Sequence, residues 1–310
     1  MRISTAWSQQ APIKAMTDKQ ANIDALQKQI SSGVKNVLPS DDPVAARKVL
    51  DLQSSIDTTL QYQRNTEVAN SHNSYEEVTL NSAENLYFRA KEISIAVVNG
   101  ILSDDEKATY QEEVDFIMED LVGLANTQNE SGDYIFSGGR TDTEAVQQAT
   151  DGKYYYYGDN VQRKLAVDDG QQIADGDLAS GIFFGIDSSS ANLTGGVTSR
   201  SVFDTLQSLS ATLAPGGEDA TESQAIIGDL DEAFGQLVNT RASVGNRMKT
   251  LDTQEVQHED LVLNMRTVLS DIKDLDYAEA ISQFNSEITA LQAAQQSYVK
   301  VQGLSLFDYI

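Results

Sequence analysis

The sequence predicts a mainly α protein, with a long antiparallel helical bundle or coiled coil built from both chain ends and a small β-rich segment inserted between them. Apolar residues recur at alternating spacings of three and four in both halves of the chain, as on one face of a helix. The middle differs, because residues 130–200 hold eleven of the twenty glycines and many Gly-Asp or Asp-Gly turn signals. Since neither helical arm can bury its apolar stripe alone, we expect the two arms to pair.

The first predicted helix has an apolar residue every seven positions, at Met16, Ile23 and Ile30, with Leu26 between them. This spacing is typical of a helix that packs along a partner helix. Gly33 is placed to end it in the left-handed conformation.

The stretch "VKNVLPSDDPV" at residues 34–44 then predicts a short connector and a new helix start. Pro39 keeps Leu38 extended. Asp42 can cap the next helix, with Pro43 in the first turn, where a missing N–H costs nothing. The group Ser40-Asp41-Asp42 is therefore interpreted as connector and cap, and not as a pair of catalytic carboxylates.

Helical patterns also precede the middle segment. One continues after Pro43 through Val49, Leu52 and Ile56, and later in the chain alternating spacings of three and four join Ala83, Leu86, Ala90, Ile93 and Val97. Asn99-Gly100 predicts the end of this helical pattern, and Ser103 with Glu106 forms a capping box for the next helix. That helix shows the 4-3-4-3 series Tyr110, Val114, Ile117, Leu121 and Leu124.

The β-prone part contains "GKYYYYGDNVQRKLAVDDGQQIADGD", residues 152–177. Short runs between turn signals predict hairpins, and alternate side chains of the tyrosine run 154–157 are expected to face a small β core. "GDYIFSGGR", residues 132–140, lacks the Lys-Ser/Thr of a phosphate loop and is interpreted as the exit from a helix into this segment.

The longest helical pattern lies in the C-terminal half. Stepping by three and four from Ile227 to Ile272 visits fourteen positions, of which eleven are apolar. A helix of this span is roughly 70 Å long and needs a covering partner. After "KDLDY" a second stripe follows: Tyr277, Ile281, Phe284, Ile288, Leu291 and Tyr298.

These patterns predict three parts. Residues 1–42 and 275–310 are expected to form terminal coiled-coil segments whose order depends on assembly. Residues 43–137 and 200–274 are expected to form the helical bundle body, and residues 138–199 a β-rich inserted domain.

The amino-acid composition excludes several kinds of function. The net charge is −25, although residues 1–50 carry seven Lys or Arg against four Asp or Glu, so the remainder carries −28. Such acidity argues against nucleic-acid binding and against anionic membranes. The absence of cysteine excludes thiolate chemistry and disulfides. No run approaches a membrane span, and the start lacks an apolar signal-peptide core.

Candidate catalytic and metal-binding residues are few. Neither His72 nor His258 has a metal-ligand spacing, and His258 falls on the apolar stripe, which favours a core position. The acidic pairs Asp168-Asp169 and Asp175-x-Asp177 are interpreted as solvated hairpin turns rather than cation ligands. We therefore expect no catalytic, cofactor-binding or metal-binding residues and no cofactor, and predict that the chain is not an enzyme.

The chain ends resemble the bacterial flagellin superfamily. The resemblance rests on "MRIST" at the start, "ISSGVKNVLPSDDPVAARKVLDLQ" at residues 30–53, "GDYIFSGGR" in the middle, and residues 270–310 at the end. Flagellins typically have a Lys-Asp-Asp-Ala-type sequence where this chain has Pro39-Ser40-Asp41-Asp42-Pro43, and they rarely close with "LFDYI". These departures favour the superfamily members that join the flagellar hook to the filament.

The resemblance implies a structural axial protein of the bacterial flagellum. It implies export through the flagellar type III channel to the extracellular flagellum, an export chaperone before secretion, and assembly into a ring. The implied partners are the first hook-associated protein on one side and flagellin on the other, with no nucleic acid and no membrane insertion. The alternative within the superfamily is a short flagellin that forms the filament itself. From another class, chemoreceptor-like signalling bundles also have long heptads, but they lack a β insertion and carry a membrane anchor.

Overall fold

The computed structural model describes residues 3–100, 102–189, 199–217 and 219–307. The chain forms two compact units. Unit 1 comprises Met1–Thr59 with Asp260–Ile310, so it joins the two chain ends, and unit 2 comprises Leu60–Glu259.

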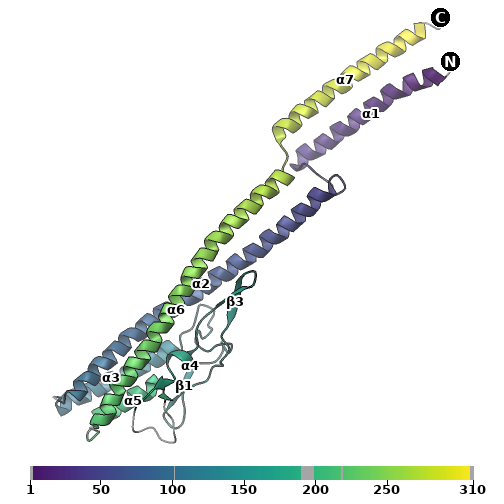
Figure 1. Ribbon diagram of the computed structural model, residues 1–310. Coiled ribbons are helices and arrows are strands. Elements are labelled where there is room, and N and C mark those ends of the chain that lie inside the picture. Colours follow the sequence, from purple (N-terminus) through teal and green to yellow (C-terminus); the bar gives the residue numbers. More distant parts are fainter. Residues whose placement is uncertain (1–2, 101, 190–198, 218, 308–310) are drawn as a thin grey trace. The chain divides into compact units, whose positions relative to one another are not determined.

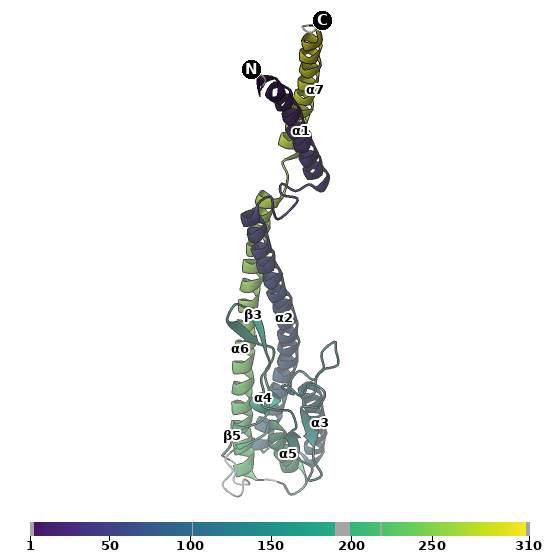
Figure 2. The ribbon, with the colours of Figure 1, turned by 90° about the vertical axis from the view of Figure 1, so that its right-hand side faces the viewer.

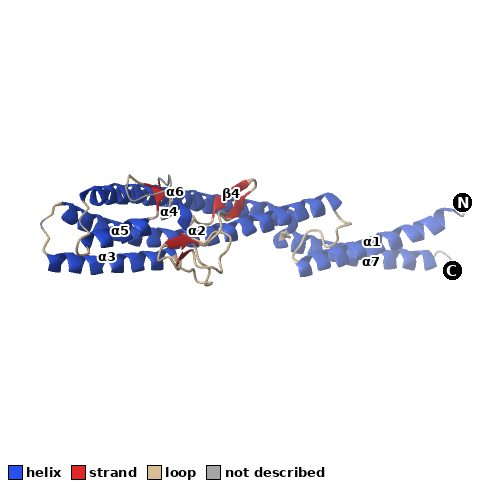
Figure 3. Ribbon diagram, turned by 90° about the horizontal axis from the view of Figure 1, so that it is seen from below, coloured by secondary structure: helices blue, strands red, loops and turns tan. Residues whose placement is uncertain are grey.

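Helices dominate both units, and strands occur only in the middle of the described chain (Figure 3). The helices are α1 (Ile3–Ser32), α2 (Pro43–Val98), α3 (Asp104–Ala125), α4 (Ala179–Ile182), α5 (Val202–Leu213), α6 (Ala220–Lys273) and α7 (Tyr277–Phe307). In unit 1, α1 and α7 lie side by side (Figures 1 and 2). The predicted pairing of helices from both chain ends, with β structure between them, is confirmed.

The β structure consists of three two-stranded antiparallel sheets in the described chain. They pair β1 (Val146–Gln148) with β2 (Tyr154–Tyr156), β3 (Lys164–Asp168) with β4 (Gln171–Ala174), and β5 (Ile186–Asp187) with β6 (Ser199–Arg200). Tyr154 and Tyr156 are half-buried, whereas Tyr155 and Tyr157 are exposed. The alternation predicted for the tyrosine run is confirmed.

The main core of unit 2 joins helices and β-rich residues in one cluster. It contains Leu80 and Tyr87 from α2, Leu121 from α3, and Phe203 and Leu206 from α5, all fully buried. From the middle segment it contains Val146, Ile182, Phe183 and Ile186, and the rings of Phe136 and Phe183 meet edge to face, 6.1 Å apart. The β-rich segment therefore shares its apolar interior with the helices.

The long stripe of α6 faces inward as predicted, since Leu230, Leu237, Val244, Leu251 and His258 are buried. Leu251 belongs to a second, smaller apolar cluster with Ala69, Val167 and Ile173. Arg241, a polar position of the stripe, is half-buried and pairs with Glu77 and Glu84 of α2. The positive charge of Arg241 on α6 is thus compensated by two carboxylates on α2.

The three-part division of the chain stays a prediction. Residues 1–2, 190–198 and 308–310, which belong to the predicted terminal segments and insertion, lie outside the described residues. The predicted inserted domain and the helical body share this core, because removal of residues 138–199 would uncover Phe203 of α5, whose ring packs against those of Tyr154 and Phe183.

Candidate assembly surface

The connector between α1 and α2 is built as its sequence predicts. Gly33 has φ of 73°, the left-handed conformation that ends α1, and its N–H donates to the Gln29 carbonyl at 2.8 Å. Asp42 caps α2, because its Oδ1 accepts from the backbone N–H groups of Val44 and Ala45 at 3.0 and 2.9 Å. Asp41 is engaged locally and accepts from the Leu38 N–H at 3.0 Å. Both carboxylates therefore have structural partners.

Backbone hydrogen bonds join this connector to the one between α6 and α7. Lys35 N–H donates to the Lys273 carbonyl at 2.9 Å, and Leu275 N–H donates to the Gly33 carbonyl at 3.0 Å. The ammonium of Lys35 also donates to the Asp271 carbonyl at 2.8 Å. The α1–α2 and α6–α7 connectors are thereby held together within unit 1.

An apolar groove of about 570 Å³ lies beside these connectors in unit 1. Its lining includes Val37, Leu38, Pro39, Leu50 and Ile272. Leu38 is 58% exposed and Leu50 is 68% exposed. We call this site the connector groove. Apolar side chains gathered around a hollow in this way are typical of a surface that binds another protein.

Few of the described side chains of the α1–α7 pair are buried. Ile23 of α1 and Ala280 of α7 are buried, whereas Met16, Leu26 and Ile30 are half-buried. Lys19 and Glu287 form an ion pair across the two helices at 2.8 Å. Such sparse burial gives the pair little intrinsic stability.

The predicted α7 stripe is unevenly buried. Tyr277 is 50% exposed and Ile281 is 47% exposed, while Phe284, Ile288 and Leu291 are half-buried. The start of α7 therefore leaves apolar surface uncovered in unit 1.

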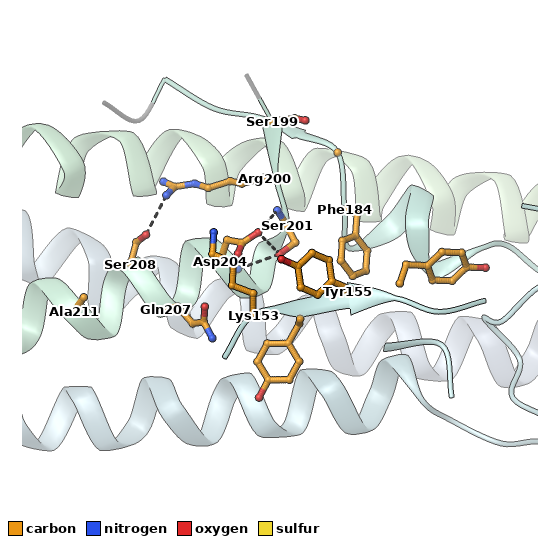
Figure 4. A pocket seen from close by; sticks show the side chains of 13 residues that line it. Lys153, Tyr155, Phe184, Ser199, Arg200, Ser201, Asp204, Gln207, Ser208 and Ala211 are labelled. Carbon is orange, nitrogen blue, oxygen red and sulfur yellow. Dashed lines mark hydrogen bonds between the residues drawn. The ribbon is translucent and has the colours of Figure 1, made fainter. Parts of the chain in front are cut away.

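In unit 2, a cleft of about 770 Å³ lies beside β2 and the start of α5, and is lined in part by Tyr155, Arg200 and Asp204 (Figure 4). The guanidinium of Arg200 is buried and donates to Glu222 at 2.9 Å and to Ser208 at 3.1 Å. Asp204 completes the capping box of α5. Arg200 and Asp204 are thus held by structural interactions.

Another buried polar cluster was not visible in the sequence. Glu76 of α2 is almost fully buried beside Asp177, and Arg247 of α6 donates to Asp177 Oδ2 at 2.6 Å. Burial, followed by the charge of Asp177, raises the pKa of Glu76 to about 8, while Arg247 opposes this rise. Asp177, predicted to lie in a solvated turn, is instead part of this cluster.

Both histidines have structural neighbours. His258 is buried, its Nε2 lies 2.8 Å from the Val167 carbonyl, and its ring stacks on Tyr62. The predicted core position of His258 is confirmed. His72 Nδ1 lies 2.7 Å from Asp175 Oδ1, so Asp175 too is a buried partner and not a solvated turn residue. Within the described residues, no group of three or more His, Asp or Glu side chains could hold a metal ion.

Comparison with known proteins defines the class. The family model described as "Bacterial flagellin N-terminal helical region" matches residues 3–141, and the "Bacterial flagellin C-terminal helical region" matches residues 227–310. Together the two matches cover more than two thirds of the chain. The chain belongs to the bacterial flagellin family.

Within this family the chain is similar over its full length to "Flagellar hook-associated protein 3" of Escherichia coli (strain K12). The two are 29% identical over 317 aligned residues, which cover 99% of each chain. Flagellin FlaB1 of Treponema pallidum is 20% identical over 236 residues, covering 76% of this chain and 73% of that protein.

A solved structure of a putative flagellar hook-associated protein from Vibrio parahaemolyticus has the same fold. Its TM-score is 0.65 at 24% identity, and the match covers 76% of this chain and 100% of that one. None of the described helices is long and apolar enough to span a lipid bilayer.

Proposed function

We propose that the chain is a structural protein of the bacterial flagellum that forms the junction between the hook and the flagellin filament. The observation that carries this proposal is the similarity to a flagellar hook-associated protein 3 from one end of the chain to the other. The flagellin relative is less similar and matches a smaller share of both chains, which disfavours the alternative of a short flagellin.

The junction role includes specific partners. The chain would contact the first hook-associated protein on one side and flagellin on the other, and copies of it would associate into a ring. The exposed connector groove and the sparsely buried α1–α7 pair support this part of the proposal, because neighbours in an assembly would supply the missing apolar contacts.

We also propose a route of export and the absence of enzymatic activity. The chain would leave the cell through the flagellar type III channel, bound beforehand by an export chaperone, and act outside the cell. It would not be an enzyme, since the polar groups that resemble a site, such as Arg200 and Asp177, are engaged in ion pairs. Real turnover in a broad hydrolase screen would contradict this part.

Electron microscopy of a strain that lacks the chain tests the junction role. A junction protein predicts that flagellin is still made and exported but filaments are detached, so hooks remain bare. If flagellin were missing from the culture, the chain would itself be the filament subunit. Filaments that stay on their hooks would overturn the proposal.

A further inference from the structure

The connector groove carries positive charge along its border. Arg47 and Lys273 line it together with the apolar side chains, and Lys48 is exposed next to Arg47 on α2. Within the described part of the chain, none of these three cations lies within ion-pair distance of a carboxylate. The groove is therefore suited to an apolar segment that carries acidic groups.

The same chain offers such a segment in unit 1. On α6, Leu261 is 48% exposed and Val268 is 40% exposed, and their spacing of seven residues puts them on one face. The inner face of this stretch holds Val262, which is buried. Helical spacing puts Asp260 and Asp271, eleven residues apart, on the side of the exposed pair that points away from this inner face. The exposed face is thus apolar with an acidic border.

We propose that the connector groove receives this α6 face, around Leu261 and Val268, from a second copy of the chain. The inference rests on the proposed function, because a ring requires contacts between copies. Charge complementarity favours a second copy: residues 1–50 carry a net charge of +3, while the remainder carries −28. Apolar contacts would fill the groove, and Asp260 or Asp271 would approach Arg47 or Lys273.

The contact has a definite symmetry. Since the groove and the α6 face are different surfaces, each copy uses its groove toward one neighbour and its α6 face toward the other. Such a head-to-tail contact generates a ring if the rotation closes, whereas a two-fold contact would stop at a dimer.

The absence of cysteine makes a direct test possible. Two single variants, L50C in the groove and L261C on α6, are expressed together in cells that lack the chain, and their flagella are isolated and mildly oxidised. Filaments that stay attached to hooks verify that the variants assemble. We expect a disulfide-linked species of twice the chain mass in which peptide mapping finds the cysteine of L50C joined to that of L261C, at least tenfold more abundant than the corresponding product of S54C and L261C. Ser54 is exposed on the same helix outside the groove.

Each other outcome contradicts the proposal. Cross-links of L50C to itself would indicate a two-fold contact, and cross-links to a protein of another mass would identify a different occupant of the groove. No cross-link above the S54C control would exclude the contact.

A charge exchange gives a second measurement. R47D should lower the yield of the L50C–L261C cross-link at least threefold, and D260R in the L261C copy should restore it. A yield unchanged by R47D would overturn the charge complementarity on which the choice of occupant rests. The proposed function is judged separately: bare hooks in the deletion strain with no cross-link would retain the junction role and reject the docking contact.

Discussion

The carboxyl of Glu76 lies in unit 2 beside Asp177, with Arg247 as the facing cation. Its pKa is raised from 4.5 to about 8, so folding favours the protonated form. The associated stability is fully present below about pH 4.5 and is lost as the pH rises through 8. Burial and the neighbouring charge of Asp177 thus favour the protonated carboxyl of Glu76, while Arg247 opposes this effect.

We predict that the free energy of unfolding falls between pH 5 and 9 and that E76Q removes most of this fall. The expected size is on the order of 1–4 kcal/mol, since each tenfold change in proton affinity on folding is worth about 1.4 kcal/mol and coupling to Asp177 reduces the sum. Urea unfolding at several pH values measures it. E67Q, which removes an exposed carboxylate of the same helix, is the matched control. A slope with pH that is the same in E76Q and wild type would show that Glu76 does not hold the proton.

Leu251 lies fully buried in the smaller apolar cluster with Val167 and Ile173. L251A should cost about 2–5 kcal/mol, the usual range for an emptied leucine site. L251D should cost more, because an unpaired carboxylate would lose its water. T253A, at an exposed position two residues further on, should cost less than about 0.5 kcal/mol. Chemical denaturation measures all three, and an L251A variant as stable as wild type would disprove the packing assignment of the stripe. Motility should decrease in the same order if the chain bears load.

Among the larger elements, the β-rich segment is distinctive because it supplies core side chains although each of its described sheets has only two strands. Its strands have two to five residues in separate pairs, yet Val146, Ile182 and Phe183 are buried among the helices. The segment depends on the helices for its interior more than on its own hydrogen bonding.

We predict that replacing residues 138–199 with a short Gly-Ser linker keeps most of the helical circular dichroism but lowers the free energy of unfolding by several kcal/mol. The helices retain their mutual contacts but lose the apolar cover of the segment. F183A in the intact chain should cost about 3–5 kcal/mol and shows how much of the loss comes from one side chain. A loss of helicity in the linker variant would mean that the helices cannot fold without the segment.

The paired chain ends should determine where the monomer is cleaved by proteases in solution. Among the described side chains, the α1–α7 pair has two buried apolar residues, Ile23 and Ala280, whereas unit 2 has a core of more than twenty. We predict that limited proteolysis of the monomer removes roughly the first 40 and the last 30 residues and leaves a compact fragment. Mass spectrometry of the fragment locates the cuts. Full protection of both ends in a demonstrated monomer would contradict assembly-dependent order.

Local patterns predicted the helices well, because helix caps and apolar periodicity depend on residues that are close together in the sequence. Gly33, Asp42, Ser103 and His258 all occupy the positions that their sequence context indicated. The Glu76 cluster was not predictable, since Glu76 and Asp177 lie 171 and 70 residues from Arg247 along the chain and the three meet only in the fold.

The connector groove was hidden for a related reason. The sequence places Leu38 in a connector and Leu50 off the apolar stripe of the next helix, and neither position by itself indicates a groove, which depends on how both connectors turn in three dimensions. Likewise, the periodic spacing of Tyr277 and Ile281 indicated a common face but not that both side chains are about half exposed.

The hydrogen bonds between the two connectors have a mechanical consequence. In a rotating filament, force acts on the helices on either side of the α1–α2 and α6–α7 connectors. A single connector without such bonds would extend most easily. Here, the backbone hydrogen bonds from Lys35 to Lys273 and from Leu275 to Gly33 link the two connectors. Force on either connector is therefore shared with the other, so the linked pair should extend less than either connector alone.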